Sequence, residues 1–168
     1  MATIMHDFYE RVIQLLGKRP GDEEFRRFID DLEESPQIYL ETPHSTEYAL
    51  NASGLFLSYF EACKCFAYVL FKSPYRVDGR SGGGSYTGNF PCGVLFGDNP
   101  VDVQRKLGLN SVKSLSSSLD VCDEYQMGDV LVAFFFAHAT GELWKVAARY
   151  VPAWDLHRGK PKESTQDS

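Results

Sequence analysis

The residue types that most often carry catalysis or metal binding are scattered along this chain. No pair at the spacing of metal ligands occurs among the four histidines, which are His6, His44, His138 and His157. Cys63 and Cys65 are separated by a single residue, which is too close for the usual C-x-x-C metal or redox motif. A serine in a G-x-S-x-G nucleophile motif is also missing. The sequence therefore predicts no catalytic residue, no metal and no cofactor.

Carboxylates gather in one short stretch of the chain. Two interpretations stay open for them: a solvated helix face, or a surface that steers a basic protein partner toward this one. Asp30 and Asp31 are consecutive, so on a helix they point about 100° apart and do not form a catalytic dyad by spacing alone. The acidic residues that we predict to contact a partner are Asp22, Glu23, Glu24, Asp30, Asp31 and Glu34.

A second candidate surface is the glycine-rich, locally basic loop over residues 72–85. Its run 81–85 has the composition of a phosphate-binding loop, but no Lys-Ser or Lys-Thr follows, so a flexible connector is the better interpretation. Aromatic and arginine side chains of the kind found in binding hot spots flank this run. We predict partner contacts for four of them, the alternative being a surface loop without function: Tyr75, Arg76, Arg80 and Tyr86.

Composition and charge limit the kinds of partner. The chain has 168 residues, 43% of them hydrophobic, and a net charge of −6, so a basic face for nucleic acid is not expected. No stretch approaches the roughly 20 apolar residues of a membrane span. The first residues lack the basic and apolar regions of a signal peptide, which predicts a cytoplasmic protein whose four cysteines are reduced.

Apolar spacing and capping residues predict three helices. The first ends near Gly17, which suits a left-handed cap, and the second spans about 22–32 with an apolar stripe at i, i+3, i+4 and i+7. The third begins after Asn99 as N-cap, has Pro100 in its first turn and ends at Gly108. A polar link is expected over 111–118. The last residues, 155–168, are polar and are expected to be a disordered tail.

Between and after these helices, strand formers predict extended segments. One of them, 129–137, is apolar on both faces, so it must be covered twice or form an interface. In the last strand, Lys145 and Arg149 fall on one face and Trp144, Val146 and Ala148 on the other. The expected strands lie around residue 48 and at 55–60, 64–71, 121–125, 129–137 and 143–150, with a further extended segment at 93–96.

The two halves of the chain resemble each other. A Val-x-x-x-Leu-Gly pattern ends a helix at Val12–Gly17 and again at Val103–Gly108, and apolar strands follow in each half. We predict one α+β domain over 1–154, with pseudo-repeats at about 1–71 and 86–154. Each repeat is a helix followed by a three-strand antiparallel meander. The meanders would join into a sheet covered by helices on one face.

The stretch 93–150, with its Val-Gln-Arg-Lys-Leu-Gly helix end and its later Tyr-…-Val-Leu-Val-x-Phe strand, is similar to the small domain of BamE/SmpA-type lipoproteins. A tandem pair of such units resembles the β-lactamase inhibitory protein. That resemblance implies a concave sheet that occupies another protein's active site. A small acidic protein of this architecture looks like a bacterial toxin-immunity protein, which neutralises its toxin by tight stoichiometric binding.

The function predicted from these observations is cytoplasmic inhibition of a toxin or enzyme domain, itself basic, by protein binding. No activity as an enzyme is predicted, nor binding to nucleic acid or membrane. Two alternatives remain: a self-associating or adaptor protein, for example a homodimer through the doubly apolar strand 129–137, and a small enzyme that uses His138 or a carboxylate.

Overall fold

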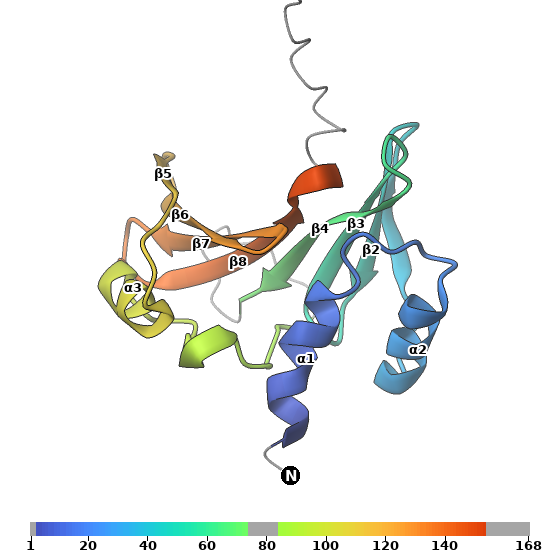
Figure 1. Ribbon diagram of the computed structural model, residues 1–168, viewed down its shortest axis with the longest axis horizontal. Coiled ribbons are helices and arrows are strands. Elements are labelled where there is room, and N and C mark those ends of the chain that lie inside the picture. The colour runs from blue at the N-terminus through green and yellow to red at the C-terminus, as the bar shows by residue number, and fades with distance from the viewer. Residues whose placement is uncertain (1–2, 74–83, 154–168) are drawn as a thin grey trace, which may run out of the picture.

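The computed structural model describes residues 3–73 and 84–153, with side chains from residue 8 onward (Figure 1). The labelled helices are α1 (Thr3–Ile13), α2 (Glu23–Leu32), the 3-10 turn η1 (Pro91–Gly93) and α3 (Pro100–Leu107), and residues 151–153 are also helical. The strands are β1 (Gln37–Glu41), β2 (Ser45–Leu50), β3 (Leu55–Phe60), β4 (Cys65–Lys72), β5 (Lys113–Ser116), β6 (Asp120–Met127), β7 (Val130–Ala137) and β8 (Leu143–Tyr150).

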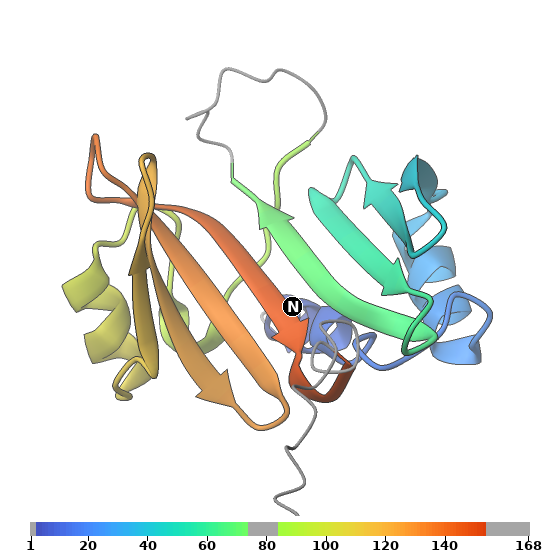
Figure 2. The same ribbon diagram turned by 90° about the horizontal axis from the view of Figure 1, so that it is seen from above.

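The strands form one antiparallel sheet in the order β1-β2-β3-β4-β8-β7-β6-β5. Each half is a meander of four consecutive strands, and the halves meet where β4 pairs with β8, with Phe71 opposite Val146. The last strand of each meander is therefore central, while the first strand, β1 or β5, forms an edge. Both ends of the sheet curve away from the helices, so the face opposite the helices is hollowed (Figures 1 and 2).

The predicted fold class, an α+β domain of two helix-plus-three-strand units under a covering layer of helices, is wrong. The molecule is mainly a single eight-stranded sheet, and its helices are only eight to eleven residues long. The strands β1 and β5 were not predicted from the sequence, because neither of them buries an apolar face. Every residue of β1 and β5 is exposed, and pairing with β2 and β6 places them at the two edges of the sheet.

Local signals did predict α3 correctly. The Asn99 side chain accepts a hydrogen bond from the Asp102 backbone N–H, the Asp102 carboxylate accepts one from Asn99, and Gly108 ends the helix in a left-handed conformation. Two other expectations were wrong. Residues 93–96 form no strand, because they link a 3-10 turn that ends at Gly93 to a further turn that begins at Phe96, and the polar link 111–118 contains β5.

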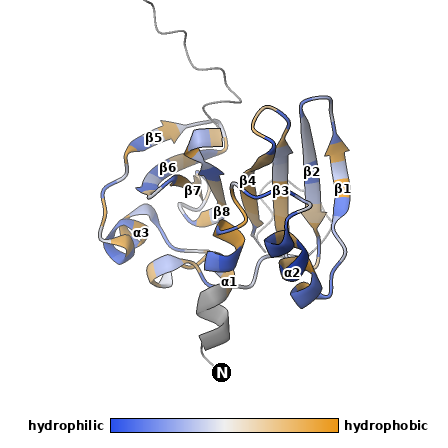
Figure 3. Cartoon of the chain, turned by 45° about the vertical axis from the view of Figure 1, so that its right-hand side comes forward, coloured by the Kyte–Doolittle hydropathy of each residue, from blue (hydrophilic) through white to orange (hydrophobic). Residues whose placement is uncertain are grey.

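The main core lies between the sheet and the helices. Tyr9 of α1 stacks on Phe71 of β4 with ring centroids 5.4 Å apart, and Phe25 of α2 lies 4.9 Å from Phe66. In the other half, Tyr125 packs edge-on against Phe134. Such aromatic pairs add to the stabilisation that burial provides. The short helices thus pack apolar side chains against part of one face of the sheet, while α2 presents hydrophilic residues outward (blue in Figure 3).

Candidate functional site

The candidate site is the sheet face opposite the helices, called here the open face. Strand alternation assigns residues to it: Val132 and Phe134 of β7 belong to the core that the helices cover, so Leu131 and Phe135 point the other way. The strand register extends this face across the molecule. Leu131 is aligned with Arg149 of β8, which is in turn aligned with Tyr68 of β4.

Half-buried apolar side chains run across the open face. They come from five strands on both sides of the β4–β8 junction, and the described chain places no helix over most of them. An apolar patch that is left partly exposed on a protein surface is a candidate binding site. Its members are Phe56, Tyr68, Leu70, Leu131, Ala133, Phe135 and Trp144, with Leu115 more exposed at the β5 edge.

A small hollow of about 80 Å³ lies near the centre of this face. Its floor is made by the small side chains of Ala133 and Ala147, and its walls by larger side chains on neighbouring strands. The hollow is too small for a drug-sized ligand, which usually occupies roughly 300–1,000 Å³. It has room for a single side chain of a partner. The wall residues are Tyr68, Glu124, Leu131, Phe135 and Arg149.

Charged groups on the open face are held by neighbours. The Arg149 guanidinium lies 3.3 Å from the Glu124 carboxylate, which is buried. The Trp144 indole N–H donates to the buried Asp120 carboxylate at 3.2 Å. The Lys145 ammonium lies 4.1 Å from the ring centroid of Phe135, a cation–π contact. These contacts orient the polar side chains around the hollow and satisfy the buried carboxylates.

Burial raises the pKa of two groups on this face. The pKa of Tyr68 rises to about 12 because of desolvation, with smaller contributions from Cys122 and Glu47. The pKa of the Cys122 thiol rises from 9.0 to about 11, mainly by burial and then by the carboxylates of Glu124 and Asp120. Both groups are neutral at physiological pH, so the centre of the face holds neutral and apolar groups between a few paired charges.

The acidic residues predicted to bind a partner lie on the opposite side of the sheet, on and near α2. Much of their charge is matched by basic neighbours. Glu23 pairs with Arg27, Glu24 pairs with Lys18 at 3.4 Å, and Asp31 pairs with Arg11 of α1. Asp30 is exposed and has no ion pair with another described residue. That this acidic surface contacts a partner stays a prediction, although the ion pairs reduce its electrostatic field.

The two other predicted acidic residues have structural contacts. Asp22 accepts a hydrogen bond from the Arg19 backbone N–H at 2.9 Å and precedes α2 as its N-cap residue. The Glu34 carboxylate accepts hydrogen bonds from the backbone N–H groups of Ala52 and Ser53, at 2.6 and 3.2 Å. Glu34 therefore holds the turn between β2 and β3.

The predicted loop surface is only partly described. Tyr75, Arg76 and Arg80 lie outside the described residues. Tyr86 was wrongly predicted as a partner contact, because it is 2% exposed and its ring packs 4.9 Å from that of Phe71 in the core. Its hydroxyl donates to the Asn89 carbonyl at 2.8 Å, so its polar end is satisfied within the chain.

A groove between α1 and α2 has a volume of about 480 Å³. Basic and acidic side chains alternate around it, so it has no strong single charge, and the Arg11–Asp31 ion pair crosses it. The pairing of its polar groups with each other leaves little to recognise a specific ligand. Its lining residues are Arg11, Gln14, Leu15, Lys18, Glu24, Arg27, Phe28 and Asp31.

His138 does not have the geometry of a catalytic base. Its Nε2 lies 2.8 Å from the Ser117 carbonyl oxygen, which can only accept, so this nitrogen donates a proton there. The same nitrogen is 3.5 Å from the Ser116 hydroxyl and is not available to take its proton. Over residues 3–73 and 84–153, no group of three His, Cys, Asp or Glu side chains could hold a metal ion.

The open face was largely missed at the sequence level. One signal pointed to it: the strand 129–137 is apolar on both faces, and the structure leaves its Phe135 side half-exposed. Trp144 was assigned to the wrong face. In the pairing of β7 with β8, Phe135 is aligned with Lys145 and Phe136 with Leu143, so the register skips Trp144. This irregularity brings Trp144 beside Lys145 and Asp120.

Comparison with known proteins gives structural likeness only. No family model matches the chain, and no curated protein matches it. An extracellular protein containing an SCP domain, from Bacillus anthracis, is similar with a TM-score of 0.56 and 14% identity over 88% of this chain and 48% of that one. This chain therefore spans about half the length of that relative, and the likeness shows a shared fold.

Two further solved structures are similar. A cysteine-rich secretory protein from Staphylococcus aureus has a TM-score of 0.49 and 8% identity, covering 83% of this chain and 46% of its own. A DUF4309 family protein from Bacillus subtilis has a TM-score of 0.45 and 13% identity, covering 74% of this chain and 76% of its own. Within the described part of the chain, no helix has the length and apolar character needed to cross a membrane.

Proposed function

We propose that this chain is a protein-binding module whose open face docks a folded protein partner. The observation that carries the proposal is the strip of half-exposed apolar side chains on that face, from Phe56 on β3 through Leu131 and Phe135 on β7. Interfaces are enriched in aromatic residues and Arg, and depleted of charge at their centre. The open face shares the enrichment in aromatic residues and Arg, and the charges that line its central hollow, Glu124 and Arg149, are paired with each other.

The size of the open face suits a standard protein interface. Neighbouring strands lie about 4.8 Å apart, so eight strands span about 34 Å, and the six inner strands, of six to eight residues, run for about 20–27 Å. A surface of these dimensions compares with the roughly 800 Å² that each partner buries in a standard interface. The hollow at its centre would accept an anchoring side chain, as hot-spot residues do.

The finer proposal is that the partner is a toxin or enzyme domain that this chain inhibits in the cytoplasm, as an immunity protein does. Its support is the curved sheet, whose open face carries no α1, α2 or α3 in the described part of the chain, and the four cysteines, none of them disulfide-bonded, which suit a reducing compartment. The B. anthracis relative is described as extracellular, so location needs its own measurement. Localisation by fractionation of the native host would decide between the two compartments.

A photo-crosslinking experiment tests the docking surface. A photoreactive amino acid is placed at Leu131 on the open face in one variant and at Val101 on α3 in a matched control. Val101 is 71% exposed and lies away from this face. In the native host we expect one protein to crosslink at position 131 and not at 101, with suppression of that protein's activity by the purified chain. Equal crosslinking at both positions would contradict the proposal.

A further inference from the structure

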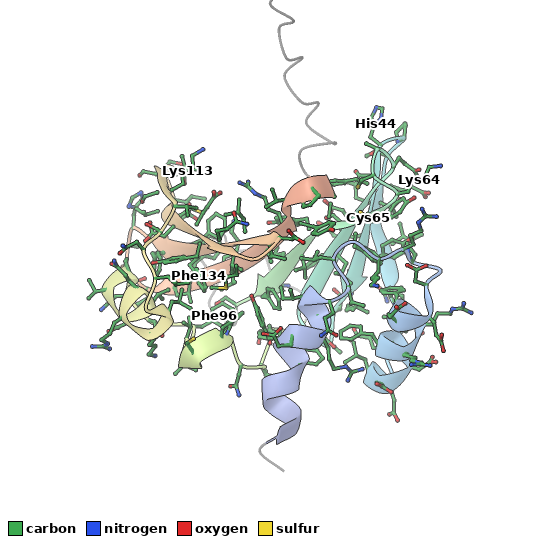
Figure 4. All side chains as sticks on the ribbon, in the orientation of Figure 1. His44, Lys64, Cys65, Phe96, Lys113 and Phe134 are labelled. Atoms are coloured by element: carbon green, nitrogen blue, oxygen red, sulfur yellow. The ribbon has the colours of Figure 1, made fainter. Side chains whose placement is uncertain are left out.

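Two cysteine sulfurs lie together in the turn between β3 and β4. The Sγ atoms of Cys63 and Cys65 are 3.3 Å apart, with the Cys65 thiol donating to the Cys63 sulfur. Lys64 between them has a left-handed backbone conformation, with φ of 51°, which allows the flanking side chains to meet. Figure 4 labels Lys64 and Cys65 near this end of the sheet. The single-residue spacing that argued against a redox pair therefore brings the thiols together.

The two thiols differ in their surroundings. Cys65 is 6% exposed and packs with Phe60, Ala67 and Ala153 in a second, smaller core cluster, whereas Cys63 is half-buried. Burial raises the pKa of Cys65 to about 12, with the neighbouring Cys63 adding to the effect and the charge of Arg19 opposing it. Cys63 is therefore the more accessible of the pair, and its sulfur is already in contact with that of Cys65.

The other thiols provide internal comparisons. Cys92 is exposed, and Cys122 is buried on β6, and neither has another cysteine sulfur among its hydrogen-bond contacts in the described chain. The sulfurs of Cys63 and Cys65, by contrast, are in direct contact at 3.3 Å. Only the Cys63–Cys65 pair combines an accessible sulfur with a second sulfur in contact.

We propose that Cys63 and Cys65 are a redox-active dithiol that small-molecule disulfides of the glutathione class oxidise to an intramolecular disulfide. The Cys63 thiolate attacks one sulfur of the small disulfide, forming a mixed disulfide and releasing one thiolate. Cys65 then transfers its proton to the released small thiolate and attacks the Cys63 sulfur. The Cys63–Cys65 bond forms, and the second small thiol leaves. Two protein thiols are oxidised as one disulfide is reduced to two thiols.

The test is mass spectrometry of the native protein after incubation with glutathione disulfide. We expect loss of the mass of two hydrogens, mapped to a peptide that contains Cys63 and Cys65, and a glutathione adduct on exposed Cys92. In Cys65→Ser the resolving thiol is missing, so a stable glutathione adduct should accumulate on Cys63. Cys92→Ser should keep the internal disulfide and lose only its own adduct.

Two results would overturn the proposal. One is a wild-type protein whose Cys63 and Cys65 stay reduced while Cys92 becomes modified. The other is a persistent glutathione adduct on Cys63 in the wild type, since it would mean that Cys65 does not resolve it. The readout depends on thiol chemistry alone, so it holds whether or not the open face binds a partner.

Discussion

Glu124 and Arg149 form an ion pair across β7, a strand that contains neither residue. Glu124 is on β6 and Arg149 on β8, and their side chains meet at 3.3 Å above β7, beside the hollow of the open face. The Glu124 side chain is 8% exposed and that of Arg149 is 24% exposed. The pair therefore links three strands of the second meander and fixes one wall of the candidate site.

Removing Glu124 should destabilise the fold. Breaking a buried ion pair costs roughly 3–5 kcal/mol, and because Arg149 is 24% exposed and has a further contact, Glu124→Ala should cost less, about 2 kcal/mol. Glu124→Gln keeps a hydrogen-bond acceptor and should lose less. The free energy of unfolding in urea measures both. Glu23→Ala, which breaks an exposed pair with Arg27, is the control and should change stability by less than about 1 kcal/mol. Equal losses of unfolding free energy in Glu124→Ala and Glu23→Ala would contradict a stabilising role for the Glu124–Arg149 pair.

Gly54 should be intolerant of any side chain. It has φ of 66°, and a Cβ there would lie 2.1 Å from the Tyr86 backbone nitrogen and 2.3 Å from the Ser85 carbonyl carbon. Because both obstacles are backbone, Gly54→Ala should cost more than about 3 kcal/mol. Gly93→Ala has a similar φ of 76° but nothing within 4 Å, so it should cost only about 1 kcal/mol. Thermal unfolding of the two variants compares them. Similar melting temperatures would mean that residues 85–86 do not pack on this turn.

Stability should fall at alkaline pH, and Cys122 should contribute to the fall. Its thiol has a pKa of about 11 in the folded protein against 9.0 as the ordinary value. The folded state therefore holds this proton more tightly than the unfolded state does. Its stabilising contribution is complete below pH 9 and is lost as the pH rises from 9 to 11.

The variant Cys122→Ala tests this linkage. Between pH 9 and pH 11 it should lose less unfolding free energy than the wild type, because the titrating group is gone. Cys92→Ala, which removes an exposed thiol, should lose as much as the wild type. A Cys122→Ala curve parallel to that of the wild type over this range would show that the thiol does not contribute.

A charge on the open face should weaken partner binding without unfolding the protein. Leu131 is half-exposed, so Leu131→Asp should cost little stability, but a carboxylate at the centre of an apolar interface should raise the Kd at least tenfold. Val101→Asp, on exposed α3, should leave the Kd within about twofold of the wild type. Titration calorimetry with the crosslinked partner measures both. An unchanged Kd for Leu131→Asp would remove the open face from the interface.

The sequence predicted an element of the fold correctly where the contacts that define this element lie close together in the chain. Helix α3 was predictable because Asn99, Asp102 and Gly108 act within their own helix ends. The edge strands β1 and β5 were not, since only partner strands define them. Tyr86 follows a glycine-rich stretch and reads as a loop residue, yet contact with Phe71 buries it. Long-range pairing and packing carry information that a single sequence pattern lacks.

The candidate site, like the fold, was predictable only where the deciding contacts are local. The doubly apolar pattern of β7 pointed to Phe135, because alternation is a local property of a strand. The place of Trp144 depends on a register irregularity, and the Glu124–Arg149 pair depends on the order of strands in the sheet. Neither the place of Trp144 nor the Glu124–Arg149 pair could be predicted from residue spacing in the sequence. The acidic run on α2 was evident in the sequence, but its pairing with Arg11 and Lys18 of another segment was not.

The measurement that tests the central claim most directly compares crosslinking from the two rival surfaces in the native host. A photoreactive residue at Leu131 probes the open face, and one at Asp30 probes the exposed acidic side of α2. Docking on the open face predicts a single crosslinked partner from position 131 and none from position 30. A partner captured from position 30 alone, or from neither position, would contradict the claim.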